Sequence, residues 1–283
     1  MRNRPKLIVI VGPTASGKSE FAVKLAQKIN GEIISADSRQ VYKELNIGSA
    51  KIAKQEMKGI THHCLNLTSI KKVFTVADFK RKAEQVIDAI YHNNKIPILV
   101  GGTGFYIKAV VDGLVLPEVL PNLELRKRLL NYSSTYLLNK LTRLDPDRAK
   151  NIERKNKRRL IRALEIIGAL GKVPKLKKGQ KYKTQFIGIK RSPTDLKKRI
   201  ENRTRKMLKK GLVRETKKLR TLGLSWKRIN EFGFEYKYPA LFLQKKITSI
   251  EMIKSINKET INYTRRQMLW WKKDNRIKWQ TTR

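Results

Sequence analysis

The chain has 283 residues and a formal net charge of +42, from 65 Lys and Arg against 23 Asp and Glu. Its 40% hydrophobic content is enough to bury a proper core, which excludes a wholly disordered protein. The single cysteine excludes an intramolecular disulfide and fits a cytoplasmic protein, and no stretch approaches the roughly 20 apolar residues of a membrane helix.

The first predicted unit is a strand, a glycine-rich loop and a helix. Residues 7–11 (LIVIV) have the composition of a buried parallel strand, and apolar residues recur at helical spacing from Phe21 to Ile29. Between them, GPTASGKS matches the phosphate-binding pattern G-x-x-x-x-G-K-[S/T] in full. Backbone N–H groups of such a loop bind phosphate oxygens, its lysine adds a charge, and its last hydroxyl ligates Mg²⁺. We therefore expect a phosphorylated ligand at Gly12, Pro13, Thr14, Ala15, Ser16, Gly17, Lys18 and Ser19, with Mg²⁺ on Ser19.

Two further strand-like segments end in polar or glycine-rich turns. Residues 31–38 end at Asp37, and the strand expected at 96–100 runs into Gly-Gly-Thr-Gly. Parallel sheets bind ligands at the carboxyl ends of their strands, so both turns should lie beside the phosphate loop. The strand at 96–100 lacks the terminal carboxylate of a typical triphosphatase, which leaves Asp37 as a metal-linked acid or general base. A helix cap formed by Asp37 is the alternative.

Two local patterns lie between these strands. Thr75 and Asp78 have the spacing of a helix N-cap with an acidic third position, and apolar residues on one helical face follow. His62-His63-Cys64 has no second ligand pair at zinc spacing, so we expect a turn or local packing there and not a metal site.

From about residue 117 to residue 183 the chain becomes basic and helical. An amphipathic helix is expected from Lys157, with stop signals at Gly171 and Pro174, and residues 184–190 are typical of another strand. This order predicts an α/β core formed by 1–116 and 184–283, with a smaller helical insertion at 117–183. We expect the insertion and the C-terminal helices of the core to bind RNA.

The basic charge is concentrated in the second part of the chain. Residues 1–120 carry a net +8, whereas residues 121–283 carry a net +34. A field of that size attracts polyanions, which favours a nucleic acid over a merely solvated surface or an anionic membrane. Near the C-terminus, Tyr263, Trp270, Trp271 and Trp279 alternate with basic residues, as in surfaces that stack unpaired bases. Packing of Trp270 and Trp271 on the core is the alternative.

These motifs occur in an order that resembles the bacterial tRNA isopentenyltransferase (tRNA dimethylallyltransferase) family. After GPTASGKS come ISADSRQVYK at 34–43, GSAK at 48–51, THH at 61–63 and VGGTGFYIKAVVDGL at 100–114, and the likeness continues to TRRQMLWW. The resemblance implies an α/β protein with a P-loop NTPase-like parallel sheet flanked by helices. It also implies an enzyme that transfers a dimethylallyl group from its diphosphate to the exocyclic N6 amine of the adenine 3′ of the anticodon.

The resemblance further implies a role for each site residue. Lys18, Ser19 and Mg²⁺ would hold the diphosphate with Arg203, Asp37 would accept the amine proton, and Thr103 would lie beside the target base. Implied tRNA contacts are Asp37, Ser38, Arg39, Gln40, Thr103, Arg126, Arg158, Arg159, Leu160, Ile161, Arg162, Arg265, Arg266, Gln267 and Trp270. We expect a monomer. The alternative function is a P-loop kinase of a small molecule or nucleotide, which would leave the basic second part unexplained.

Overall fold

The computed structural model describes residues 5–281. Contacts divide the chain into two compact units, the first formed by Met1–Gly113 with Gln180–Arg283 and the second by Leu114–Gly179. The second unit overlaps the insertion expected at 117–183.

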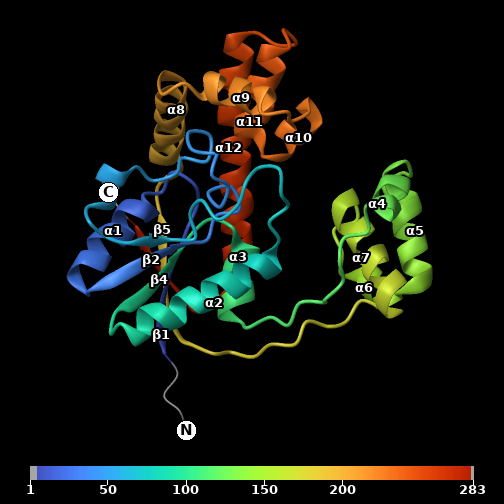
Figure 1. Cartoon of the computed structure of the whole chain (residues 1–283), viewed down its shortest axis with the longest axis horizontal. Coiled ribbons are helices and arrows are strands. Elements are labelled where there is room, and N and C mark those ends of the chain that lie inside the picture. Colours follow the sequence, from blue (N-terminus) through green and yellow to red (C-terminus); the bar gives the residue numbers. More distant parts are fainter. Residues whose placement is uncertain (1–4, 282–283) are drawn as a thin grey trace. The chain divides into compact units, whose positions relative to one another are not determined.

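The first unit is built on a parallel sheet, as the sequence predicts (Figure 1). In the described part of the chain the sheet has six strands in the order β3-β2-β4-β1-β5-β6, and every pair is parallel. The strands are β1 (Lys6–Val11), β2 (Gly31–Ser35), β3 (His62–His63), β4 (Ile96–Val100), β5 (Lys183–Lys190) and β6 (Ile277–Thr281). The predicted strands at 7–11, 96–100 and 184–190 are confirmed, and β5 places the chain back in the sheet after the second unit.

Helices cover both faces of this sheet because alternate residues of each strand point to opposite faces. Along β1, Ile8 and Ile10 pack in the same apolar cluster as α1 (Lys18–Lys28). Leu7, Val9 and Val11 pack instead with α2 (Val76–His92) and α3 (Gly104–Val111). Burial on both faces explains why β1 is apolar at every position after Lys6.

The N-terminus of α2 forms as its sequence predicts. The Thr75 hydroxyl accepts a hydrogen bond from the Asp78 N–H at 3.2 Å, and the Asp78 carboxylate accepts from the Thr75 N–H at 3.0 Å. This reciprocal pair satisfies two N–H groups that would otherwise lack partners at the helix end.

The rest of the first unit is a helical segment after β5. It consists of α8 (Pro193–Lys209), α9 (Leu212–Thr221), α10 (Trp226–Glu231), α11 (Phe234–Leu243) and α12 (Ser249–Trp271). One apolar cluster joins Val41, Leu45 and Ile70 to residues of α9, α10 and α11, so the chain after β2 is anchored on these helices. Within residues 5–281, no helix is both long and apolar enough to cross a membrane.

The second unit is helical, with its own core. It contains α4 (Leu123–Leu130), α5 (Ser134–Leu144), α6 (Pro146–Lys150) and α7 (Lys157–Leu170). Leu160, Ile161 and Leu164 of α7 pack against Leu129, Leu137 and Leu141 of α4 and α5. Helix α7 ends at Gly171, whose φ of 76° is in the left-handed region that favours glycine.

Candidate active site

The phosphate loop follows β1 and has the backbone that its sequence demands. Gly17 has φ 95°, and a Cβ at Gly12 would overlap the carbonyl of Ile189, so both positions require glycine. The Lys18 ammonium donates to the Pro13 carbonyl at 2.6 Å, across the loop. Burial, and then the charge of Arg203, lower the pKa of Lys18 to about 7. The loop is therefore compact, and the Lys18 side chain lies across it.

The turns after β2 and β4 join at the carboxyl edge of the sheet. The Thr103 N–H donates to the Ala36 carbonyl at 3.3 Å, and the Ser38 N–H donates to the Thr103 hydroxyl at 3.1 Å. A Cβ at Gly101 would overlap the Ala36 carbonyl, which explains the glycine there. The predicted pair Asp37 and Thr103 therefore lie on two turns that are hydrogen-bonded to each other.

Asp37 both caps a turn and lines a cavity. One carboxylate oxygen, Oδ1, accepts from the Arg39 N–H at 2.8 Å and from the Gln40 N–H at 3.3 Å, so it caps the turn. Asp37 also lines a cavity of the first unit. The capping contacts fix the carboxylate in place without removing it from the cavity.

This cavity has a volume of about 990 Å³ and joins most of the predicted donor site. Of the predicted residues, it is lined by Thr14, Ala15, Ser16, Gly17, Lys18, Ser19, Asp37, Gln40, Arg203 and Gln267. Gln40 is held at its wall, since its amide oxygen accepts from the Ser35 hydroxyl at 2.8 Å and its amide nitrogen donates to the Ser49 carbonyl at 3.3 Å. Arg203 reaches the cavity from α8.

The remaining predicted residues of the first unit lie outside the cavity lining. Gly12 and Pro13 are buried at the start of the loop, and Arg39 donates to the Glu231 carbonyl at 3.0 Å. Arg265, Arg266 and Trp270 are exposed on α12, whereas Gln267 on the same helix is buried.

The C-terminal aromatic residues divide between core and surface. Trp271 is 1% exposed and belongs to the core under the sheet, while Trp270 is 39% exposed. Trp279 lies on β6 and packs with the same core, beside Gly188 of β5. Packing therefore accounts for Trp271 and Trp279, and Trp270 has a surface available for stacking.

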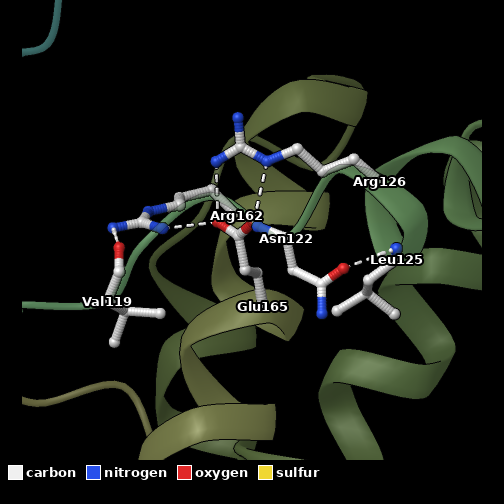
Figure 2. A network of polar contacts seen from close by, with 6 residues as sticks. All are labelled: Val119, Asn122, Leu125, Arg126, Arg162 and Glu165. Atoms are coloured by element: carbon white, nitrogen blue, oxygen red, sulfur yellow. Dashed lines mark hydrogen bonds and ion pairs between the residues drawn. The ribbon is translucent and has the colours of Figure 1, made fainter.

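The residues predicted in the second unit differ in burial and in their partners. Leu160 and Ile161 are core residues, 0% and 4% exposed, so their side chains pack and do not face solvent. Arg158 and Arg159 are exposed on α7. Arg126 and Arg162 both bind the buried carboxylate of Glu165, as Figure 2 shows.

The Glu165 cluster is a closed polar network. Arg126 donates to both oxygens of Glu165, at 2.8 and 2.7 Å, and the Asn122 N–H donates at 2.7 Å. Arg162 binds the same carboxylate and also donates to the Val119 carbonyl at 2.9 Å (Figure 2). These hydrogen bonds hold the pKa of Glu165 below its ordinary value against the effect of burial. The two arginines have a structural partner, whatever else they contact.

Breaking this network should destabilise the second unit. Glu165→Ala leaves two guanidinium groups without their carboxylate, and losing one partner of a buried pair costs about 3–5 kcal/mol. Glu153→Ala is the matched control, because Glu153 and its partner Arg159 are 57% and 55% exposed and such pairs contribute about 0–1 kcal/mol. Urea unfolding followed by circular dichroism measures both, and equal losses would contradict the assignment.

One acidic residue near the cavity was missed from the sequence. Glu235 begins α11, and a Cβ at Gly233 would lie 3.2 Å from its Oε2 and 3.9 Å from Arg39 Nε. Burial raises the pKa of Glu235 to about 7, although the charges of Arg203 and Arg39 oppose this. The sequence gives no motif for it; only the fold brings α11 beside the turn at Arg39.

This raised pKa predicts a pH-dependent stability. A carboxyl group whose folded pKa exceeds its ordinary value of 4.5 destabilises the fold progressively as the pH rises from about 4.5 to 7. Glu235→Gln should therefore gain stability relative to the wild type between pH 5 and pH 8, on the order of 2 kcal/mol. Thermal unfolding at both pH values measures it, with Asp88→Asn, exposed on α2, as control. A difference independent of pH would contradict the raised pKa.

Fold and site together define a P-loop α/β protein in which the phosphate loop and the Asp37 carboxylate line one cavity. The family model for IPP transferase matches residues 40–274, so the chain belongs to that family. It is 38% identical over 283 residues to the tRNA dimethylallyltransferase of Halothermothrix orenii, covering 96% of this chain and 86% of that protein.

Solved structures agree in fold. The tRNA isopentenylpyrophosphate transferase of Bacillus halodurans is 35% identical with a TM-score of 0.74, covering 98% of this chain and 90% of that one. A eukaryotic dimethylallyltransferase, described as acting on tRNA, is 29% identical with a TM-score of 0.84, covering 98% of this chain and 74% of that one. The predicted family and P-loop fold are confirmed.

Within the described part of the chain, no group of three or more His, Cys, Asp or Glu side chains could hold a metal ion. His63 instead contacts the Glu32 carboxylate at 2.6 Å, and His62 and His63 form β3. His62 and His63 thus lie in a short edge strand and not in the expected turn.

Proposed function

We propose that this protein transfers a dimethylallyl group from dimethylallyl diphosphate to the exocyclic N6 amine of the adenine 3′ of the anticodon in tRNA. The observation that carries the proposal is a cavity that the phosphate loop, Arg203 and Asp37 line together, with the Thr103 turn hydrogen-bonded beside it. Membership of the IPP transferase family, and relatives named for this reaction, support it.

The phosphate loop would hold the leaving group. As the bond between the prenyl carbon and the diphosphate oxygen breaks, negative charge accumulates on the diphosphate, and fixed donors there stabilise the transition state. The Lys18 ammonium and the Arg203 guanidinium supply charge at the cavity, and loop N–H groups supply hydrogen bonds.

Mg²⁺ fits this end of the cavity by the chemistry of its donors. The Ser19 hydroxyl and the Asp37 carboxylate both line the cavity, and oxygen ligands of this kind, completed by water and substrate phosphate, are those that Mg²⁺ prefers. Ser19 would hold the ion, which would neutralise charge on the diphosphate.

Asp37 would serve the other reactant. An exocyclic amine is a weak nucleophile, and it must lose a proton as its nitrogen bonds to the prenyl carbon. A carboxylate held by the Arg39 and Gln40 N–H groups would accept that proton. Thr103, on the adjoining turn, would contact the base.

Two arguments support an RNA partner: the basic charge of the chain, and the need for the target base to reach the cavity. The target base must leave its stack to enter a cavity, and the protein must grip the backbone around it. The net +34 after residue 120, and exposed Arg265, Arg266 and Trp270 on α12, suit that task. We propose that the protein is cytoplasmic. We also propose that it is a monomer, since one chain supplies every donor-site residue named.

The kinase alternative has no support among the relatives, and a direct comparison tests it. We would incubate the protein with Mg²⁺, unmodified tRNA and labelled dimethylallyl diphosphate, and in parallel with labelled ATP and no tRNA. Label should appear on the RNA in the first reaction, with no phosphate transfer in the second. ATP turnover with no labelled RNA would favour the kinase.

A further inference from the structure

The resemblance implies a tRNA contact at Gln267, but the structure shows contacts of its side chain within the protein. Gln267 is 5% exposed on α12, while its neighbours Arg265 and Arg266 face solvent. Its side chain lines the same cavity as the phosphate loop. Its contacts within the protein indicate what it does.

Both ends of the Gln267 amide are hydrogen-bonded to backbone of the active site. Its Oε1 accepts from the Thr14 N–H at 2.8 Å, and its Nε2 donates to the Gly102 carbonyl at 3.1 Å. The donor at Thr14 and the acceptor at Gly102 fix which end of the amide is which. One side chain thus spans the phosphate loop after β1 and the glycine-rich turn after β4.

Two glycines leave space for α12 beside this bridge, which is the Gln267 side chain hydrogen-bonded to Thr14 and Gly102. A Cβ at Gly102 would overlap the Gln267 Nε2, and one at Gly104 would overlap the Trp270 indole nitrogen. The close approach of α12 therefore accounts for both glycines, since neither has positive φ. The Thr14 N–H is also committed to Gln267, which leaves the later N–H groups of the loop for phosphate.

We infer that Gln267 is a positioning residue, which fixes the phosphate loop relative to the Thr103 turn and ties both to α12. The inference rests on the proposed function. The leaving diphosphate would sit on one side of the bridge and the target base on the other, so the bridge sets the distance over which the prenyl group moves. A misplacement of about 1 Å between reacting groups can reduce a rate about 10²-fold.

Gln267→Met tests this, because methionine has similar length and volume and makes neither hydrogen bond. The single-turnover rate at saturating tRNA and donor should fall about 10²-fold, with the tRNA dissociation constant unchanged. Gln85→Met, at an exposed position of α2, is the matched control and should behave as the wild type.

Gly102→Ala tests the same bridge from the other side and leaves the buried position on α12 intact. Its new methyl group would displace the flexible end of Gln267, so the rate should again fall while tRNA binding and the melting temperature hold. If Gln267→Met does not fold, Gly102→Ala decides the question.

Two results would overturn the inference: unchanged rates in the folded variants, or weaker tRNA binding with an unchanged rate at saturation, which would make Gln267 a direct tRNA contact. The activity of the wild type in the same assay distinguishes a failure of the proposed function from a failure of the inference about Gln267. If the wild type transfers no prenyl group to tRNA, the proposed function fails and the inference fails with it. If only the variants contradict expectation, the proposed function stands.

Discussion

Asp37→Asn should reduce the turnover number about 10²- to 10⁴-fold while leaving tRNA affinity close to that of the wild type. Asparagine keeps an Oδ1 that can accept from the Arg39 and Gln40 N–H groups, so the turn after β2 should survive. What it loses is the negative charge and the basic oxygen that would take the amine proton. Steady-state prenyl transfer and a tRNA-binding titration give the two quantities separately.

The matched control for Asp37 is another capping aspartate. Asp145 accepts from the Arg148 N–H at 2.9 Å through its Oδ1 and lies in the second unit, outside the cavity lining. Asp145→Asn should leave turnover unchanged. If Asp37→Asn instead lost tRNA affinity and turnover in equal measure, Asp37 would be an RNA contact and not the base.

Lys18→Ala should reduce kcat/KM for dimethylallyl diphosphate by about 10³-fold, the scale seen when a donor to developing charge is removed. Lys18 is folded over the phosphate loop onto the Pro13 carbonyl, and its charge would meet the diphosphate as the bond to carbon breaks. The measurement is a donor titration at fixed, saturating tRNA, followed by single turnovers.

Lys24→Ala supplies the control on the same helix. The Lys24 side chain is 60% exposed, pairs with Glu20 at 2.8 Å and does not itself line the cavity, so its loss removes a charge from α1 outside the cavity lining. Lys24→Ala should keep the wild-type kcat/KM, so the two alanine variants should differ in kcat/KM by the whole loss expected for Lys18→Ala. If Lys18→Ala kept the wild-type kcat/KM, the proposed role of the phosphate loop in holding the diphosphate would be wrong.

The core of the fold could be predicted because its signals are local. The strand, loop and helix around Gly12–Ser19 each have a distinct pattern, and the reciprocal cap at Thr75 needs only residues three positions apart. Strand β6 was missed because IKWQT has only one buried residue, Ile277. Its pairing with Phe186 and its neighbours in β5 makes it a strand, and no local pattern shows that partner.

The site was predictable in its parts and less so in its connections. The motifs place Lys18, Asp37 and Thr103 at strand ends, and parallel pairing brings those ends together. Glu235 and the Gln267 bridge depend on how α11 and α12 pack against loops far away in sequence. Charge alone also cannot tell an arginine at the surface from one, such as Arg126, that holds a buried carboxylate.

The most direct test of the central claim is analysis of the nucleosides of an unmodified tRNA after incubation with the protein, dimethylallyl diphosphate and Mg²⁺. The proposed function predicts one new nucleoside, N6-dimethylallyl adenosine, from the position 3′ of the anticodon, and none when that adenine is replaced by guanine. A tRNA recovered without any prenylated nucleoside, under conditions where it binds the protein, would contradict it.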